Sequence, residues 1–247
     1  MPESSSSLKP MLRKLRQWRE LDAADEDALL TLPHRIAKIE RASYLVREGK
    51  AADHVCLLVK GYAIRHKIVA TGARQIVGVH MRGDLVDLQN ALLRCADHNV
   101  QALTDVQVAY IPSEAIKRLA FARPSVGEAL WVDTLVDAAI FREWIVNVGR
   151  RDARARIAHL FCELALRLRS ADCGDTSGFE LPMSQEQIAD CVGLTSVHVN
   201  RVLMRLEAEQ LISRKSSRSV AIGDWTQLAA AGDFDESYLH LREKAAH

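Results

Sequence analysis

The chain has 247 residues and a nearly balanced charge, with 33 Lys and Arg against 32 Asp and Glu. This balance excludes a uniformly basic, histone-like nucleic-acid binder, although it leaves room for a local basic face. A hydrophobic share of 48% and a charged share of 26% are typical of a globular protein and exclude a disordered one. At about 100–200 residues per domain, the length suggests one large or two modest domains.

The N-terminal stretch MPESSSS is polar and has no apolar core, so we predict no signal peptide. The longest apolar runs, such as Val55–Val59, are strand-sized and far short of the roughly 18 residues of a membrane span. The cysteines are scattered, odd in number and without a C-x-x-C pair, which gives little support to a disulfide framework or a zinc site. They are Cys56, Cys95, Cys162, Cys173 and Cys191. We expect a cytoplasmic protein with free thiols and no membrane partner.

A helical stretch is expected over Leu8–Leu32, and a β region follows from Arg35 to Ile111. Glycines punctuate the β region at intervals of 12, 11 and 11 residues: Gly49, Gly61, Gly72 and Gly83. Turn signals about every 8–12 residues are typical of a small all-β sandwich or barrel. The runs VCLLVK, YAIRHKIV and RQIVGVHM are expected to be strands. Two more strands are expected between Val100 and Ile111, with a break near Thr104 and Asp105.

From Ser125 to about Val148 the sequence contains no proline, and its apolar residues recur at helical spacing. One set of residues follows alternating steps of four and three, the spacing of a coiled-coil seam. The set is Trp131, Leu135, Ala138, Arg142 and Ile145. Arg142 interrupts the seam, and the run covers only about two heptads. A helix packed on its own domain is therefore an equally good interpretation.

A second helix is expected after Gly149, which can end the first one. Asp152 can cap the second helix by accepting backbone N–H bonds. Its apolar face is expected to contain Ile157, Leu160, Phe161, Leu164 and Leu168.

The most informative stretch runs from Leu181 to Ile222. Ser184–Gln187 fits the S/T-x-x-E/Q capping box, which marks the start of a helix. Gly193 is expected to end that helix, because glycine permits the unusual backbone angles of a tight turn. Thr195 is well suited to cap the next helix. A short helix, a turn with glycine and a second helix predict a helix-turn-helix.

The second helix of this motif has two distinct faces when its residues are placed about 100° apart. The inward face is apolar and contains Val199, Val202, Leu203 and Leu206. The opposite face shows Val197, Arg201 and Met204. The N-terminal part of such a helix enters the major groove of DNA. The residues expected at base edges are Ser196, Val197, Asn200 and Arg201.

Each of these side chains suits a contact with DNA. Arg201 has the geometry to donate two hydrogen bonds to guanine, Val197 suits a thymine methyl group, and Asn200 suits adenine or a phosphate. The segment ISRKSSRSVAI after the helix predicts two strands around a polar turn, a wing that brings its basic residues near phosphates. The alternative is that the arginines are solvated charges on a surface helix. The helix caps, the glycine turn, the apolar spacing of the second helix and the predicted wing all agree, and this agreement favours DNA binding.

At these residues the sequence resembles the Crp/Fnr family of bacterial transcription regulators, and the resemblance covers nearly the whole chain. It implies an α+β fold with an N-terminal antiparallel β-roll, a long dimerisation helix and a C-terminal winged helix-turn-helix. The expected parts are a helix and β-roll sensor domain at 1–124, the dimerisation helix at 125–148, and the DNA-binding domain with a C-terminal tail at 149–247. The resemblance also implies a homodimer on palindromic double-stranded DNA, a contact with RNA polymerase, and a regulator rather than an enzyme, with activation favoured over repression.

Carried over residue by residue, the resemblance assigns base reading to Ser196, Val197, Asn200 and Arg201. Positions that mostly touch phosphate hold Gln185, Thr195 and His198, and the basic residues Arg205, Lys215 and Arg218 are expected near phosphates as well. Gly149 and Asp152 fall in the hinge. Many family members have a glutamate where Val197 stands, so the DNA half-site should differ from theirs at that base pair.

Further departures concern the effector. Where members that respond to cyclic AMP have a Gly-Glu pair and an Arg-Ser pair, this sequence has Asp87-Leu88 and Ala96-Asp97. Ala96-Asp97 stands in place of the phosphate-binding pair, and an aspartate there repels the cyclic phosphate, so cyclic AMP is not expected to bind. The first cysteine is Cys56, so the N-terminal iron–sulfur cluster of oxygen-sensing members is not expected either. No effector-binding residue is assigned.

Four further residues are candidates for sensing. His66, His80 and His98 lie in the β region, where a haem ligand is less common than a satisfied surface or core histidine. Cys191 lies off the core-facing positions of its helix and is a candidate redox switch, although the neighbouring Asp190 would not activate its thiol. Two other functions remain open: a ligand-binding regulatory module of an enzyme assembly, and a constitutive regulator that needs no effector.

The neutral total charge hides two unlike segments. Residues 195–222 carry five bases and two acids, a formal charge of +3, and residues 223–247 carry five acids and two bases, a formal charge of −3. A compact basic surface is therefore expected at the reading helix and wing. Because so small a basic surface neutralises few phosphates per subunit, we expect modest affinity for random DNA.

Overall fold

The computed structural model describes residues 7–51, 53–93, 95–171, 173, 178–216 and 219–241. It divides into two compact units. The first, called the roll unit, contains the described residues of 1–66 and 79–138 and also Leu241. The second, called the winged unit, contains the described residues of 139–240 together with 67–78, the outer part of one hairpin.

The roll unit begins with two short helices, α2 (Lys9–Leu15) and α3 (Ala23–Leu30). The single helical stretch expected over 8–32 is therefore interrupted, because Asp22 caps α3 by accepting a hydrogen bond from the backbone N–H of Asp25 at 2.7 Å. The strands that follow are β1 (Arg35–Ile39), β2 (Tyr44–Val46), β3 (His54–Lys60), β4 (Ala63–Ile68), β5 (Arg74–His80), β6 (Asn99–Ala102) and β7 (Val106–Pro112). The expected strands are thus confirmed in β3–β7, including the break between β6 and β7.

These strands form two sheets, with the orders β1-β7-β3 and β2-β6-β4-β5. The pairs β1–β7, β3–β7, β2–β6 and β4–β6 are antiparallel. One hydrophobic core draws side chains from both sheets, including Val46, Cys56, Val100 and Val108. The four glycines that punctuate this region all have positive φ angles, as expected at turns. The antiparallel β architecture predicted for this part of the chain is confirmed.

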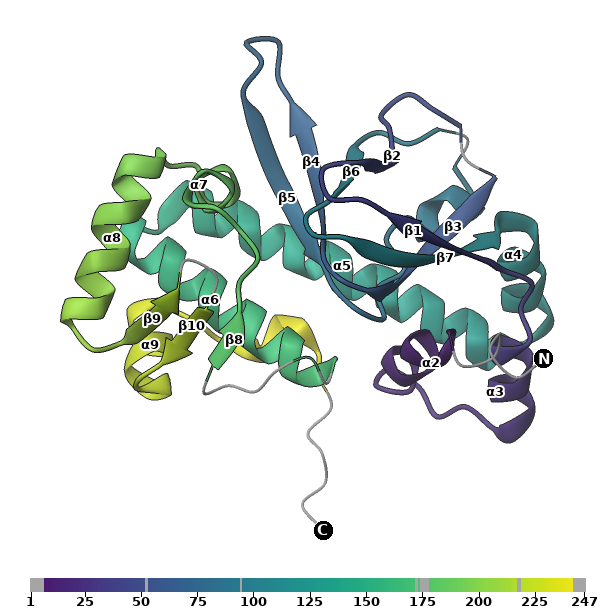
Figure 1. Ribbon diagram of the computed structural model, residues 1–247. Helices are drawn as coiled ribbons and strands as arrows, with labels where there is room; N and C mark the ends of the chain where they lie inside the picture. The colour runs from purple at the N-terminus through teal and green to yellow at the C-terminus, as the bar shows by residue number, and fades with distance from the viewer. Residues whose placement is uncertain are drawn as a thin grey trace. The chain divides into compact units, whose positions relative to one another are not determined.

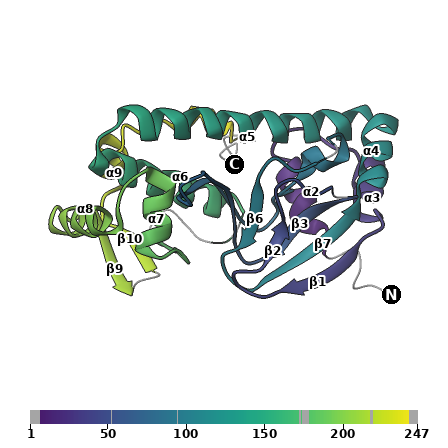
Figure 2. The ribbon, with the colours of Figure 1, turned by 90° about the horizontal axis from the view of Figure 1, so that it is seen from above.

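After the sheets, the chain forms two helices, α4 (Ser113–Ala122) and α5 (Pro124–Arg150), and the short 3₁₀ segment η1 (Leu88–Ala91) precedes β6. Sequence patterns predicted α5 but neither α4 nor η1. Figure 2 shows α5 as one continuous helix, and it spans 27 residues. The expectation that Gly149 ends this helix is wrong. An exposed glycine costs a helix only about 1 kcal/mol relative to alanine, and burial of Trp144 and Asn147 anchors the final turns.

The winged unit contains four helices that the structure describes after α5, a three-stranded sheet and one 3₁₀ segment (Figure 1). They are α6 (Ala153–Ser170), β8 (Gly178–Glu180), α7 (Gln185–Val192), α8 (Ser196–Ala208), β9 (Ile212–Ser216), β10 (Ser219–Ile222), α9 (Trp225–Ala231) and η2 (Glu236–Leu239). The two wing strands are confirmed as β9 and β10, and β8 adds a third strand in the order β8-β10-β9. The helical content of α9 and η2 was not predicted, since this stretch was expected to be a tail.

Helix α6 forms the centre of the winged unit. Asp152 caps it as expected, accepting a hydrogen bond from the Ala155 N–H at 2.9 Å. Its predicted apolar face, from Ile157 to Leu168, is buried. The rest of the helix is covered almost as well, so that two polar side chains, His159 and Glu163, are also buried. In the part of the chain that the structure describes, no helix is both long enough and apolar enough to cross a membrane.

Candidate nucleic-acid interface

The two helices α7 and α8 are connected by the tight turn that the sequence predicts. Ser184 Oγ accepts a hydrogen bond from the Gln187 N–H at 3.2 Å, and Gln187 Oε1 accepts one from the Ser184 N–H at 2.8 Å. This is the complete capping box at the start of α7. Gly193 ends the helix with φ at +65°, a left-handed conformation that strains other residues. Thr195 Oγ1 then accepts from the His198 N–H at 3.3 Å and caps α8.

The faces of α8 agree with the sequence analysis. Val199, Val202, Leu203 and Leu206 are buried against the rest of the winged unit. On the opposite face, the side chain of Val197 is 61% exposed and that of Met204 is 58% exposed. The other candidate reading residues are also exposed: Ser196, Asn200 and Arg201. This arrangement leaves a helix whose first turns present polar groups and an uncovered valine to solvent.

Asn200 is held in place by its neighbours. Gln185 Nε2, on α7, donates a hydrogen bond to Asn200 Oδ1 at 3.1 Å, and Asn200 Nδ2 lies 3.9 Å from Met204 Sδ. Reading adenine through two hydrogen bonds requires both the oxygen and the nitrogen of an asparagine amide. Because an amide oxygen has two lone pairs, Asn200 can make both of these bonds while it still accepts from Gln185. Its N–H groups also suit a phosphate oxygen.

The basic residues around α8 differ in their partners. Arg205 Nε donates to Glu209 Oε1 at 2.8 Å. Glu209 also binds Arg154 of α6, at 2.6 Å from its Nη2 atom. Arg214 of β9 forms a two-pronged pair with Glu207, at 2.9 and 2.7 Å. Hydrogen bonds from these arginines hold the pKa of both glutamates below the ordinary value.

Arg201 differs from these arginines. It is exposed and forms no ion pair with any residue that the structure describes. Its guanidinium therefore keeps all its donors for a partner outside the chain. Of the expected wing contacts, Lys215 lies in β9 and Arg218 falls outside the described residues.

The proposed coiled-coil seam lies on an uncovered side of α5. Trp131, Leu135 and Ile145 are 68%, 53% and 69% exposed, whereas Val136, Ile140 and Trp144 on other faces of the helix are buried. The alternative, a helix packed on its own domain, holds for these other faces of α5 but does not account for the three exposed side chains. Large exposed apolar side chains in one row are typical of a protein–protein contact.

The roll unit contains many buried polar groups that bind one another. Arg65 donates to Asp137 at 2.8 Å and to the Val86 carbonyl at 2.7 Å. Lys14 forms ion pairs with Asp84 at 2.9 Å and Asp133 at 2.8 Å. These contacts link α2, the strands and the first half of α5. The interior between the roll and α5 is thus occupied by the protein's own charges.

The positions considered for a cyclic phosphate have their own partners too. Asp87 is fully buried and accepts a hydrogen bond from Asn90, and His98 Nε2 lies 3.5 Å from its other oxygen. Ala96 is buried, whereas the Asp97 side chain points to solvent. A buried carboxylate at Asp87 disfavours an anionic ligand there. The prediction that cyclic AMP does not bind thus has a structural basis, although it stays a prediction.

The histidines considered as haem ligands are all buried: His66, His80 and His98. Burial and the nearby Arg65 guanidinium hold the pKa of His80 below its ordinary value. Among the described residues, no three His, Cys, Asp or Glu side chains gather in a group suited to a metal ion.

The expectation that Cys191 lies off the core-facing side of α7 is wrong. Its side chain is 2% exposed, because α7 packs against both α6 and α8. Burial and the Asp190 carboxylate raise the pKa of Cys191 well above the ordinary thiol value. A thiol that is both inaccessible and protonated is poorly suited to redox sensing.

Comparisons with known proteins agree with this architecture. Residues 155–231 match the family model of the Crp-like helix-turn-helix domain, and residues 36–123 match that of the cyclic nucleotide-binding domain. The transcriptional activator protein FnrL of Cereibacter sphaeroides is 29% identical over 79% of each chain. The nitrogen fixation regulation protein FixK of Azorhizobium caulinodans is 26% identical over 86% of this chain and 88% of its own.

The solved structure of FixK2 from Bradyrhizobium japonicum superposes with a TM-score of 0.75 at 22% identity. The match covers 81% of this chain and 98% of that one. At this identity the likeness concerns the fold. It confirms the predicted α+β class, with antiparallel strand sheets, a long helix and a C-terminal helix-turn-helix.

Proposed function

Because the chain belongs to the Crp/Fnr family of transcription regulators, we propose that it is a homodimeric activator that reads a palindromic DNA operator. As a member of that family it is a DNA-binding regulator and not an enzyme. The observation that carries the proposal is the face of α8, where Ser196, Val197, Asn200 and Arg201 are exposed while the other side of the helix is buried. Only the exposed residues are available to DNA.

In the proposed complex the first turns of α8 enter the major groove. Arg201 donates two hydrogen bonds to guanine O6 and N7, and Val197 packs against a thymine methyl group. Ser196 and Asn200 contact the neighbouring base edges. Thr195 and His198, at the start of α8, lie where the positive end of the helix dipole favours a phosphate. Gln185, Arg205, Lys215 and Arg218 add phosphate contacts that set the register.

Two chains pair through the exposed seam of α5. Burying Trp131, Leu135 and Ile145 against a second copy removes a row of apolar surface from water. A dimer of this kind places two α8 helices about 34 Å apart, one turn of DNA, and so reads a palindrome. Arg142 lies within the same row, where it is exposed and its charge favours one register of the pair.

Regulation is proposed to pass from the roll to the hinge. A change in the roll unit biases the junction between α5 and α6, in the expected hinge with Gly149 and Asp152, and so alters how the two reading helices meet DNA. The effector is proposed to be other than cyclic AMP, because of the buried Asp87. Activation through RNA polymerase is inferred from relatives such as FnrL, which is named an activator. The proposed site of action is the cytoplasm, where bacterial DNA lies.

A second candidate is a constitutive regulator that requires no effector. The observation in its favour is that Lys14, Arg65 and their acidic partners occupy the interior between the roll and α5. Titrating the purified protein with its operator, without any additive, distinguishes the two. If the purified protein binds its operator with full affinity and cell extract does not change that affinity, the constitutive form is supported. If cell extract increases the affinity, the regulated form is supported.

Replacing Arg201 by alanine is expected to relax discrimination at one guanine per half-site. The loss of two hydrogen bonds should cost about 1–3 kcal/mol at that base pair, or roughly 5- to 150-fold in affinity. Competition binding with operators substituted at each position measures it. The matched control is Arg205→Ala, one helical turn further on, where the arginine is paired with Glu209. This substitution should lower the affinity for all DNA sequences alike. A uniform loss across sequences for Arg201→Ala would contradict the base-reading role.

A further inference from the structure

The C-terminal segment Gly232–His240 lies beyond the part of the chain that matches the helix-turn-helix family model, which ends at residue 231. This segment, called the C-terminal clasp, contains η2 and folds back onto the winged unit. It contacts α6 and also Arg151, the residue that directly follows α5. Only two residues, Arg151 and Asp152, separate these helices. The clasp therefore contacts the junction at which the reading domain joins the long helix, and α6 beyond it.

A single carboxylate lies at the centre of this contact. Glu163, on α6, is fully buried. Its Oε2 atom accepts hydrogen bonds from Trp144 Nε1 of α5 at 2.9 Å and from the Tyr238 hydroxyl of the clasp at 2.8 Å. Its Oε1 atom accepts from Arg167 at 3.1 Å. A buried charge is costly unless it is paired, so loss of any of these donors is expected to disturb the others.

A second link crosses the junction itself. The Arg151 side chain is 9% exposed and lies 2.7 Å from Glu143 Oε1 of α5. Its Nη2 atom also donates to the backbone carbonyl of Asp233, at 3.0 Å, and to the Asp233 carboxylate, at 3.3 Å. The clasp thus holds the residue that directly follows α5. Asp233 has a φ angle of +46°, a strained conformation for a residue with a side chain.

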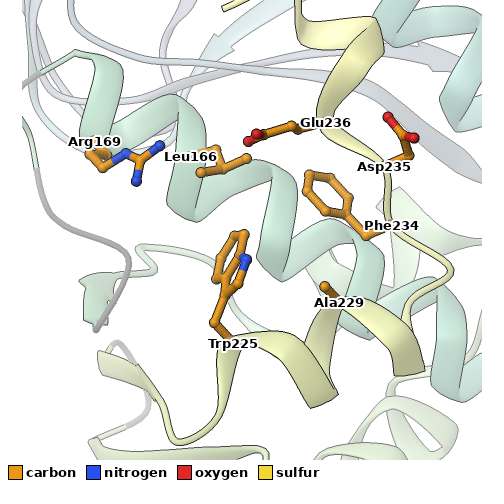
Figure 3. A pocket seen from close by; sticks show the side chains of 7 residues that line it. All are labelled: Leu166, Arg169, Trp225, Ala229, Phe234, Asp235 and Glu236. Atoms are coloured by element: carbon orange, nitrogen blue, oxygen red, sulfur yellow. The ribbon is translucent and has the colours of Figure 1, made fainter. Parts of the chain in front are cut away.

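The clasp lies close on the backbone of α6. The ring of His159 contacts Phe234 edge to face at 5.1 Å and stacks on Tyr238 at 5.9 Å. A side chain on Gly232 would place its Cβ 2.6 Å from the backbone nitrogen of His159, so only glycine allows this approach. Phe234 also meets Trp225 edge to face, with ring centroids 6.2 Å apart. Both rings line a pocket of about 440 Å³ beside α6, seen from close by in Figure 3.

We propose that the C-terminal clasp fixes the angle between α5 and α6, with Tyr238 and Glu163 as positioning residues for DNA reading. The inference rests on the proposed function. Since α5 carries the dimer seam and α6 carries the reading domain, the angle between them sets the separation of the two α8 helices. Burial and the Glu163 carboxylate raise the pKa of Tyr238, so its hydroxyl remains a hydrogen-bond donor at every physiological pH.

Tyr238→Phe tests the clasp in the full-length protein, because it keeps the ring packing and removes only the hydroxyl. Binding is measured on a palindromic operator, on palindromes with one base pair added or removed between half-sites, and on a duplex with one half-site scrambled. We expect affinity for the palindrome to fall about tenfold, within the usual range of coupling between sites. The preference for the correct spacing should fall with it. Affinity for the single half-site should change less than twofold.

Trp144→Phe removes the donor on the α5 side of the same carboxylate and should reproduce the effect. In the double variant, the affinity for the palindrome should fall by less than the product of the two single fold-losses, because both substitutions act through Glu163. Glu236→Gln, an exposed change in η2, is the matched control and should bind as the unchanged protein does.

The outcomes separate the clasp from the proposed function. If the unchanged protein shows no preference among DNA sequences, the proposed function fails. If the unchanged protein binds its palindrome but the Tyr238→Phe variant has the same affinity and the same spacing preference, the proposed role of the clasp is wrong. Equal losses on the palindrome and on the single half-site also overturn it, since they would reflect general destabilisation of the winged unit.

Discussion

Replacing Leu135 by glutamate is expected to convert a dimer into monomers and to weaken binding to a palindromic operator by about 10²- to 10⁴-fold, the gain that linkage of two binding modules supplies. Leu135 lies at the middle of the exposed row on α5, one helical turn from Trp131. In a symmetric pair, each copy contributes the same patch. The substitution therefore buries two like charges close together.

Sedimentation equilibrium measures the assembly, and fluorescence anisotropy measures DNA binding. Leu135→Met is the matched control, because it keeps an apolar side chain of similar volume and should remain dimeric. Half-site binding should persist in the glutamate variant, since the winged unit is unchanged. A Leu135→Glu protein that remains a dimer, with its operator affinity intact, would show that two chains pair through another surface.

Replacing Phe161 by alanine is expected to unfold the winged unit and abolish DNA binding. Phe161 is among the largest fully buried side chains, and its ring lies 6.1 Å from that of Phe179 in β8. Removal of a buried phenylalanine ring costs about 3–5 kcal/mol, which includes the cavity that it leaves. That loss is a large fraction of the roughly 5–15 kcal/mol by which a folded domain is stable.

Urea denaturation followed by circular dichroism measures the change. Hydrogen exchange assigns it to one unit: protection should fall in α6, α7 and α8, while β3 and β7 keep theirs. The matched control is Phe121→Ala, the same substitution at an exposed position of α4. It should change the free energy of unfolding by no more than about 0.5 kcal/mol. Equal effects of the two substitutions would contradict the assigned core.

The helix-turn-helix was predictable because its signals are local. The capping box at Ser184, the glycine at position 193 and the cap at Thr195 each act within a few residues. The apolar spacing of α8 follows from the helical period alone. Its two faces could therefore be assigned from the sequence, and with them the exposure of Arg201. The strands of the roll were found for the same reason, since glycine turns separate them.

The clasp was not predictable, because its contacts join residues far apart in the chain. Tyr238 meets Glu163 across 75 positions, and Arg151 meets Asp233 across 82. In the sequence, Tyr238 and Asp233 belong to a segment that shows only as an acidic tail. The error at Gly149 has a similar origin, since tertiary packing of neighbouring side chains outweighs one weak helix former. Cys191 was misplaced because α7 is covered on two sides, by α6 as well as α8.

The central claim is that two chains read a palindrome through the exposed face of α8. The most direct test selects a palindrome from a randomised duplex library and measures affinity and stoichiometry for it and for a scrambled duplex, at physiological salt. We predict two chains per palindrome and binding at least about 10³-fold tighter than to the scrambled duplex. Equal affinity for both duplexes, in the presence and absence of cell extract, would contradict the account.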